Sequence, residues 1–307
     1  MSPGILAPVA LLAALLLSSA GQAETPPLTL AAIGPGGQFD NASPVEGLVR
    51  RPAVDIKSRA ALVVRADNGE VLYRKNSDRN IPIASITKLM TAMVVLDAGQ
   101  SLDERLKISA EDVDRLRNTH SRLAVGTVLT RRDLMILALM SSENRAASAL
   151  LRNYPGGKKA GVAAMNRKAR EIGMATAKFV EGTGLSGDNR SSPVDLVRLV
   201  KAADAYPEIR EYSTMTELDV KVGRHVQSFR NTNPLVKSEE WSIGLTKTGF
   251  LNEAGRCLVM QAQVAGMPVI FVLMDSVGKL TRVGDANRVR RWLEEMSPVS
   301  QMARSDI

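Results

Sequence analysis

The sequence feature that most constrains the fold is the placement of strand-like segments near both ends of the 307-residue chain. Near the start, residues 60–64 and 70–73 look like two strands joined across an Asn68-Gly69 turn, which predicts a β-hairpin. The last third has three more strand-like segments, separated by short breaks as in an antiparallel meander: residues 244–248, 256–264 and 268–274. Since the pattern from about 102 to 200 is mainly helical, we expect one sheet built from distant parts of the chain. The fold class is then α+β, one domain with a helical insertion at about 100–205.

The most apolar of the predicted helices runs from Ser85 to Gly99, residue types that often start and end helices. Apolar side chains lie almost all round it, so we expect it to be buried inside the domain. Further helices are predicted, the first of them after a capping box at Thr130–Asp133: residues 134–140, 145–153, 193–205 and 285–296.

Residues 1–23 predict export. An apolar run from Ile5 to Leu17 is followed by small residues, and Gly21 and Ala23 fit the small-residue rule for a secretory cleavage site. The run is shorter than the roughly 20 apolar residues that span a bilayer, so a signal peptide is favoured over an uncleaved anchor. We therefore expect cleavage after Ala23 and a location in the periplasm.

The segments that flank the folded region are polar or irregular. Residues 24–52 are rich in Pro, Gly, Ala and Ser without a sustained period, which predicts a flexible linker. Residues 299–307 form a polar tail without the pattern of an amphipathic anchor, so we expect at most peripheral membrane contact. The folded domain is then expected over 53–298.

The chain is basic, with a formal net charge of +8 and a pI near 9.7, which is compatible with an anionic partner. The basic residues are scattered, however, and aromatic residues are only 4% of the chain. Few aromatic platforms exist for stacking bases, so no nucleic-acid partner is expected. A solvated basic surface without a specific partner remains the alternative interpretation.

Cysteine and histidine are too scarce for redox or metal chemistry. Cys257 is the only cysteine, so no intramolecular disulfide can form, and its apolar surroundings predict an inert core residue. His120 and His225 are isolated from each other and from any ligand-like cluster, so we expect no metal site.

Ser85 and Lys88 are the first candidates for catalysis, because a spacing of three at a helix start places both on one face. A serine hydroxyl is a weak nucleophile that needs a neighbouring base, and a lysine can serve if burial or a nearby cation lowers its pKa. The backbone N–H groups at the start of the helix would suit a developing oxyanion. By itself the pattern is common, and a helix cap followed by a solvated lysine is the favoured interpretation of the isolated motif.

Two further motifs change this balance. Ser142-Glu143-Asn144 lies between two predicted helices, and Lys247-Thr248-Gly249 ends a predicted strand. Ser-x-x-Lys, Ser-x-Asn and Lys-Thr-Gly in this chain order form the motif set of penicillin-binding proteins and class A β-lactamases. Because each motif also lies in the matching structural setting, the three together predict an acyl-transferring serine enzyme.

The sequence resembles the low-molecular-mass penicillin-binding proteins of peptidase family S11. The resemblance is strongest to their D-alanyl-D-alanine endopeptidase branch, the penicillin-binding protein 7 type. It extends from about Ser58 to Glu295 and includes three segments besides the motifs: residues 179–186, 229–233 and 250–257. It implies a β-lactamase/transpeptidase-like fold, with an antiparallel five-stranded sheet flanked by helices, and a serine D,D-peptidase domain over 53–298.

The resemblance also implies catalytic roles. Ser85 would attack the carbonyl of a D-alanyl bond and form an acyl-enzyme, and Lys88 would take the serine proton. Ser142 would relay a proton to the leaving amine, and Asn144 would hold the substrate amide. No metal or organic cofactor enters this mechanism.

The same resemblance assigns the Lys-Thr-Gly segment to substrate binding. Lys247 would keep Lys88 neutral and attract a substrate carboxylate, Thr248 would donate a hydrogen bond, and Gly249 would belong to the same subsite. The backbone N–H groups of Ser85 and Phe250 would form the oxyanion hole.

The function expected from these features is a periplasmic serine D-alanyl-D-alanine endopeptidase that cleaves peptidoglycan cross-links. Its partners would be peptidoglycan stem peptides, with β-lactam antibiotics as acylating inhibitors. A D-alanyl-D-alanine carboxypeptidase shares every one of these residues and stays open as an alternative. A serine β-lactamase and a non-catalytic wall-binding protein are less favoured.

Three charged residues near the motifs have less specific interpretations. Glu181 could be a deacylation base, as a β-lactamase needs, but a structural part in its loop is favoured. Asp275 and Arg282 follow the last predicted strand near the rim of the site, where solvated charges are favoured over a part in peptide binding.

Overall fold

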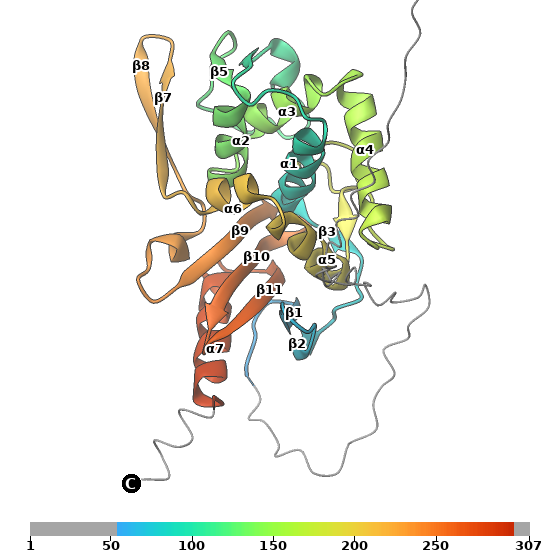
Figure 1. Cartoon of the computed structure of the whole chain (residues 1–307), viewed down its shortest axis with the longest axis vertical. Helices are drawn as coiled ribbons and strands as arrows, with labels where there is room; N and C mark the ends of the chain where they lie inside the picture. The colour runs from blue at the N-terminus through green and yellow to red at the C-terminus, as the bar shows by residue number, and fades with distance from the viewer. Residues whose placement is uncertain (1–53, 298–307) are drawn as a thin grey trace, which may run out of the picture. The chain divides into compact units, whose positions relative to one another are not determined.

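The computed structural model describes residues 54–297, which lie within a compact unit, Arg51–Ile307. The predicted signal peptide, linker and polar tail lie outside the described residues. A five-stranded sheet forms the centre of the described part, in the order β2-β1-β11-β10-β9 (Figure 1). The strands are β1 (Ala60–Arg65), β2 (Val71–Lys75), β9 (Ser242–Leu251), β10 (Gly255–Val264) and β11 (Met267–Ser276).

Every strand of this sheet is antiparallel to its neighbours. β9, β10 and β11 follow one another as the predicted meander, and β1 pairs with β11 from Ala60↔Met274 to Arg65↔Val269. The strands from the two ends of the chain therefore meet in one sheet, as the sequence predicted. Each strand begins and ends within a few residues of its predicted limits.

The alternation of side chains along β1 explains how helices cover both faces of this sheet. Leu62 and Val64 pack into the core shared with the helical region, whereas Ala61 and Val63 pack into a second core. The second core is closed by α7 (Thr281–Glu295), which covers β10 and β11. On the other face lie α5 (Pro193–Asp204) and α6 (Pro207–Thr214) (Figure 1).

Helix α1 (Thr87–Asp97) lies at the centre of the helical region and is buried from Thr87 to Val95, as expected from its apolar circumference. It packs against the other helices of this region, which are α2 (Arg131–Met140), α3 (Asn144–Arg152) and α4 (Gly157–Glu171). The predicted capping box is present, because Thr130 accepts from the Asp133 backbone and Asp133 accepts from the Thr130 backbone.

Short elements complete this region. Pairs of short strands are formed by β3 (Ile81–Pro82) with β6 (Arg190–Ser191) and by β4 (Arg105–Lys107) with β5 (Val128–Thr130). Single 3₁₀ turns are η1 (Ala84–Ile86), η2 (Ala110–Asp112) and η3 (Pro234–Lys237). No helix among residues 54–297 is both long and apolar enough to cross a membrane.

A hairpin of β7 (Glu217–Val222) and β8 (His225–Arg230) projects from the sheet region and was not predicted (Figure 1). Its strands mix charged and apolar residues, and only Val220 and Phe229 are buried. Residues 217–222 alternate strictly between charged and apolar side chains, which is the pattern of a half-buried strand, so this segment carried a signal that the prediction overlooked.

Candidate active site

Ser85 lies in η1, the 3₁₀ turn that leads directly into α1. The preceding residue, Ala84, has a left-handed backbone conformation with φ 48°, which a non-glycine residue rarely adopts. The start of α1 has no side-chain cap. Ser85 Oγ instead accepts a hydrogen bond of 2.9 Å from Lys88 Nζ. The interpretation of Ser85 as a simple helix cap is therefore wrong.

Lys88 is buried beneath Ser85, with only 1% of its surface exposed. Its Nζ donates three hydrogen bonds, to Ser85 Oγ at 2.9 Å, Asn144 Oδ1 at 2.8 Å and the Thr183 carbonyl at 2.6 Å. Burial lowers the pKa of Lys88 from 10.5 to about 8, although the carboxylates of Glu181 and Glu143 act in the opposite direction. A lysine with this pKa can give up its proton near neutral pH, as a general base must.

Ser142 lies in the turn between α2 and α3, and Asn144 is the first residue of α3; both line the same cleft as Ser85. Ser142 has φ 61°, and its hydroxyl has no hydrogen-bond partner among the described residues. Asn144 is engaged on both sides: its Oδ1 accepts from Lys88 and its Nδ2 donates to Thr119 Oγ1 at 3.1 Å. The Ser-x-Asn segment therefore contributes one unengaged hydroxyl and one amide that contacts the base.

Thr119 belongs to a polar loop that sequence reasoning did not associate with the site. Its Oγ1 donates to Asp114 Oδ2 at 2.7 Å while accepting from Asn144. No motif identifies Thr119, because it lies 25 residues before Asn144 in a segment without sustained period.

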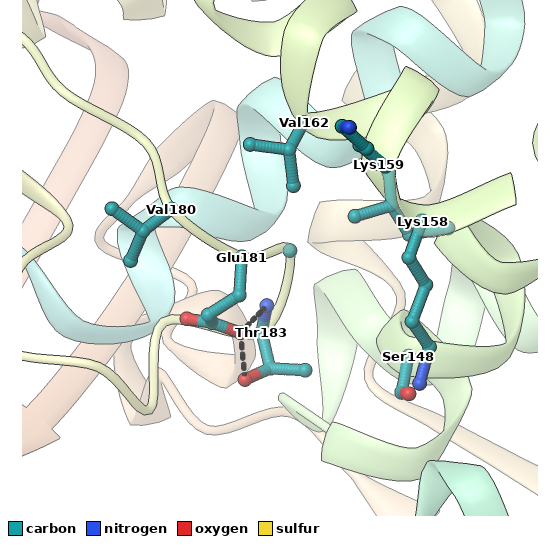
Figure 2. A pocket seen from close by; sticks show the side chains of 9 residues that line it. Ser148, Lys158, Lys159, Val162, Val180, Glu181 and Thr183 are labelled. Carbon is teal, nitrogen blue, oxygen red and sulfur yellow. Dashed lines mark hydrogen bonds between the residues drawn. The ribbon is translucent and has the colours of Figure 1, made fainter.

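A loop organised by Glu181 holds the third partner of Lys88. The Glu181 carboxylate accepts from the backbone N–H groups of Thr183 and Gly184, at 2.6 and 2.7 Å, and from the Thr183 hydroxyl at 2.5 Å. Asn189 Nδ2 donates to it as well, at 2.7 Å. Figure 2 shows the two bonds from Thr183 to Glu181. With its oxygens engaged in this way, Glu181 has the structural part in the loop that was favoured.

The Lys-Thr-Gly segment runs along β9 beside the nucleophile. Lys247 is 1% exposed and donates to the Thr248 carbonyl at 3.0 Å. Burial, with the positive charges of Lys88 and Arg282, lowers the pKa of Lys247 well below 10.5. The Thr248 hydroxyl donates to Thr232 Oγ1 at 2.7 Å.

Two glycines allow the backbone to pass close to Ser85. A Cβ atom on Gly249 would lie 3.0 Å from the Ser85 nitrogen, and one on Gly184 would lie 2.0 Å from the Ala84 carbonyl oxygen. Gly184 also has φ 81°. Any larger residue at Gly184 would displace the turn that carries the nucleophile.

Arg282 is not the solvated charge that was expected. It is 8% exposed, and its Nε is buried without a hydrogen-bond partner in the described part of the chain. Its Nη1 donates to the Lys279 carbonyl at 3.3 Å, and the residue lines the same cleft as Ser85, where a guanidinium with no carboxylate partner among the described residues favours an anionic ligand. Asp275, in contrast, lies at a partly exposed position 3.6 Å from the Arg59 guanidinium.

These residues surround a cleft of about 290 Å³. Its lining includes six of the eight predicted site residues: Ser85, Ser142, Asn144, Thr248, Gly249 and Phe250. Lys88 and Lys247, the other two, are buried beside it. A second cavity, of about 450 Å³, lies between the Glu181 loop and helices α3 and α4 (Figure 2), and it contains none of the motif residues.

The cysteine and the two histidines considered in the sequence analysis take no part in this site. Cys257 is fully buried, and burial raises the pKa of its thiol to about 12, so it is an inert core residue as predicted. His120 and His225 are both exposed. Among residues 54–297 no three His, Cys, Asp or Glu side chains are grouped so that they could hold a metal ion.

Comparison with known proteins points to one family. A family model described as D-alanyl-D-alanine carboxypeptidase, peptidase S11, matches residues 47–278. A D-alanyl-D-alanine endopeptidase of Pseudomonas aeruginosa is 50% identical over 242 residues, which cover 78% of each chain. A D-alanyl-D-alanine endopeptidase of Escherichia coli is 46% identical over 255 residues, or 82% of each chain.

The fold is also shared with a solved structure. Penicillin-binding protein D2 of Listeria monocytogenes, determined with cefotaxime bound, is 29% identical with a TM-score of 0.68. The match covers 78% of this chain and 98% of that one. It confirms the expected fold class, and together with the family match it shows that the chain belongs to peptidase family S11, the D-alanyl-D-alanine carboxypeptidase family of serine hydrolases.

Proposed function

We propose that this protein is a serine D-alanyl-D-alanine endopeptidase that opens peptidoglycan cross-links through an acyl-enzyme on Ser85. The observation that carries the proposal is the Lys88 amine, which is buried, 2.9 Å from Ser85 Oγ, and has its pKa lowered to about 8. A neutral amine at this distance can take the serine proton while Oγ attacks the carbonyl carbon.

The bond between that carbon and the leaving nitrogen then breaks, and the amine must receive a proton as it leaves. Ser142 is the group we assign to this relay, because its hydroxyl lines the cleft without a hydrogen-bond partner among the described residues. Water then hydrolyses the ester and frees Ser85. The backbone N–H groups of Ser85 and Phe250 are proposed to stabilise the oxyanion in both steps.

Substrate binding is assigned to the residues opposite the nucleophile. Asn144, Thr248 and Gly249 line the cleft where an extended peptide would lie. A carboxylate beside the scissile bond would meet Arg282, with Lys247 buried nearby. In the free enzyme the Thr248 hydroxyl is engaged with Thr232, so substrate binding would require it to turn from this partner.

Relatives that are 50% and 46% identical are named endopeptidases, which supports cross-links as the substrate over terminal D-alanine. A carboxypeptidase shares the same chemistry and is the alternative outcome of the test below. A β-lactamase is disfavoured, because Glu181 is engaged with its own loop and is not available to activate water.

We further propose that the protein acts in the periplasm after cleavage of its signal peptide behind Ala23. The apolar run and the small residues of the first 23 positions support export. Stem peptides of peptidoglycan and β-lactam antibiotics would then be its partners there.

Two measurements test the function. Incubation with a labelled penicillin should yield a stable adduct on a peptide that contains Ser85, and Ser85→Ala should abolish the label. Continued labelling of Ser85→Ala would disprove the assignment of the nucleophile.

Digestion of purified cross-linked muropeptides identifies the bond that is cleaved. We expect monomers that retain their own terminal D-alanine where it was present. Release of free D-alanine without loss of cross-links would instead establish a carboxypeptidase.

A further inference from the structure

The direction in which Lys88 offers its lone pair decides whether it can act on Ser85. A neutral lysine has two N–H bonds and one lone pair. The three neighbours of Lys88 Nζ are Ser85 Oγ, Asn144 Oδ1 and the Thr183 carbonyl. If the two N–H bonds go to Asn144 and Thr183, the lone pair must face Ser85, whose hydroxyl can donate to it.

One of these neighbours could defeat this arrangement. The Thr183 carbonyl can only accept a hydrogen bond, but the amide of Asn144 has an accepting end and a donating end. With Nδ2 turned to Lys88, Asn144 would donate to the lone pair, and an N–H bond of Lys88 would point at Ser85 instead. The orientation of one amide therefore controls the base.

A hydrogen-bond chain sets this orientation from the other side. Asn144 Nδ2 donates to Thr119 Oγ1 at 3.1 Å, and Thr119 Oγ1 donates to Asp114 Oδ2 at 2.7 Å. A carboxylate can only accept, so the Thr119 proton points to Asp114 and a lone pair of Thr119 is left for Asn144. The accepting end of Asn144 is thereby directed at Lys88.

Asp114 is held in the state and place that this chain needs. Burial acts to raise the pKa of Asp114, but hydrogen bonds from Thr119 and from backbone N–H groups lower this pKa below 3.8. The carboxyl group is therefore an anion at neutral pH. Its carboxylate accepts from the N–H groups of Leu116, Arg117 and Thr119, at 2.8, 3.0 and 2.9 Å. The loop backbone thus holds the Asp114 carboxylate in the position from which it accepts the Thr119 proton.

We propose that Asp114 and Thr119 are positioning residues, which orient Asn144 so that the lone pair of Lys88 faces Ser85. This inference rests on the proposed function, since it gives Lys88 the part of the base. Neither residue takes a proton from Ser85 or forms a bond to the substrate in this scheme.

The charged groups that face Lys88 from other elements take no part in the hydrogen-bond chain from Asp114 through Thr119 to Asn144. Glu181 lies in the loop of Thr183, Glu143 immediately precedes α3, and Lys247 comes from β9. Removal of the Thr119 hydroxyl leaves all three in the protein. A change in the titration of Lys88 in such a variant would therefore report on the orientation of Asn144.

The test compares Thr119→Val with Thr119→Ser by the rate of Ser85 acylation with labelled penicillin over pH 5.5 to 9.5. We expect Thr119→Val to lower the rate at the alkaline plateau by about tenfold, the equivalent of one hydrogen bond of about 1.4 kcal/mol. The acid limb of the profile should also move to lower pH, because an N–H facing the ammonium form disfavours it. Thr119→Ser keeps the hydroxyl that links Asn144 to Asp114 and should recover most of the acylation rate.

Thr176→Val is the matched control. Thr176 makes the same pair of bonds to an aspartate, with its N–H and its hydroxyl each 2.7 Å from Asp195 Oδ2, but has no link to Lys88. Thr176→Val should lower the free energy of unfolding without moving the acid limb of the acylation profile. An acid limb that is unchanged in Thr119→Val, or a Thr119→Ser variant as slow as Thr119→Val, would overturn the proposal.

A second variant covers the case in which Thr119→Val does not fold. Asp114→Asn retains an oxygen that can accept from the loop backbone, but it offers an N–H to Thr119. The Thr119 hydroxyl would then donate to Asn144, so the direction of the hydrogen bonds reverses. The acid limb of the acylation profile should shift as in Thr119→Val. A profile identical to that of the wild type would overturn the inference. Failure of the wild type to be acylated would instead remove the proposed function, so the two outcomes are distinguishable.

Discussion

The behaviour of Lys88 is decided by what surrounds a single nitrogen atom. Burial destabilises its ammonium form, whereas three hydrogen-bond acceptors and the carboxylates of Glu181 and Glu143 stabilise that form. The balance leaves the pKa at about 8. A lysine exposed to water would be almost fully protonated at neutral pH and useless as a base.

This pKa predicts the pH dependence of Ser85 acylation. Only neutral Lys88 can accept the serine proton, so the rate should rise with pH and level off above about 8. At pH 6 the rate should be about a hundredfold below the plateau, since each pH unit below the pKa removes a factor of ten. Stopped-flow acylation by a chromogenic cephalosporin measures this profile.

Lys88→Arg is the control, because arginine stays protonated throughout this range. Its acylation rate should be at least about a hundredfold lower than that of the wild type at every pH. A wild-type profile that is flat between pH 6 and 9 would refute Lys88 as the base.

The sequence predicted the residues of the site that belong to compact motifs. Ser85, Lys88 and Asn144 do come together, within 3 Å of the Lys88 nitrogen. Thr119 and the Thr183 carbonyl were missed because nothing local marks them: one is a threonine in a polar loop, and the other acts through its backbone. Arg282 was misjudged because its burial depends on the packing of α7 beside the cleft, which a charged residue after a strand does not reveal.

At the scale of elements, the loop of Gly184 is pressed against the turn that carries Ser85. Gly184 combines a left-handed φ of 81° with a position where a Cβ would lie 2.0 Å from Ala84 oxygen and 2.8 Å from Ser85 nitrogen. Gly99, at the end of α1, has a similar φ of 63° but no atom within 4 Å of a Cβ. The two positions differ in contact and not in backbone conformation.

We therefore expect different outcomes for alanine at the two glycines. Gly99→Ala should cost about 1 kcal/mol of stability, from backbone strain alone. Gly184→Ala should cost at least about 3 kcal/mol or reduce acylation about a hundredfold, because the nucleophile turn must move. Urea unfolding and penicillin acylation measure both effects. Equal effects of the two variants would show that the close approach is unimportant.

Prediction of the elements succeeded where apolar runs or capping motifs were clear. The meander of β9 to β11 and the buried α1 follow from apolar runs bounded by turn-like or capping residues, and the capping box of α2 follows from a local Thr-x-x-Asp motif. The hairpin of β7 and β8 was missed although β7 alternates charged and apolar residues, because β8 lacks such a regular alternation and the two strands together bury only Val220 and Phe229.

At the scale of the molecule, the two ends of the described chain are tied together by Asp285. This buried residue of α7 accepts from the N–H groups of Lys57 and Ser58, at 2.9 and 2.7 Å, and from the Ser58 hydroxyl at 2.6 Å. These bonds join the entry to β1 with the closing helix.

Asp285→Ala should lower the free energy of unfolding by about 3 kcal/mol, since it leaves buried donors without an acceptor. Glu295→Ala, an exposed carboxylate near the end of the same helix, should change it by less than about 0.5 kcal/mol. Chemical denaturation of both variants at neutral pH measures the difference. Equal stabilities would show that the tie is dispensable.

The pairing of β1 with β11 has a consequence for when the enzyme can first work. β1 is made early, yet its neighbour β11 is the last of the described strands to be synthesised. A polypeptide that stops before residue 242 lacks β9, on which Lys247 and Gly249 lie, as well as this neighbour. Nascent molecules that have not yet reached residue 242 should therefore be unable to cleave a bond, so activity becomes possible only when synthesis is nearly complete.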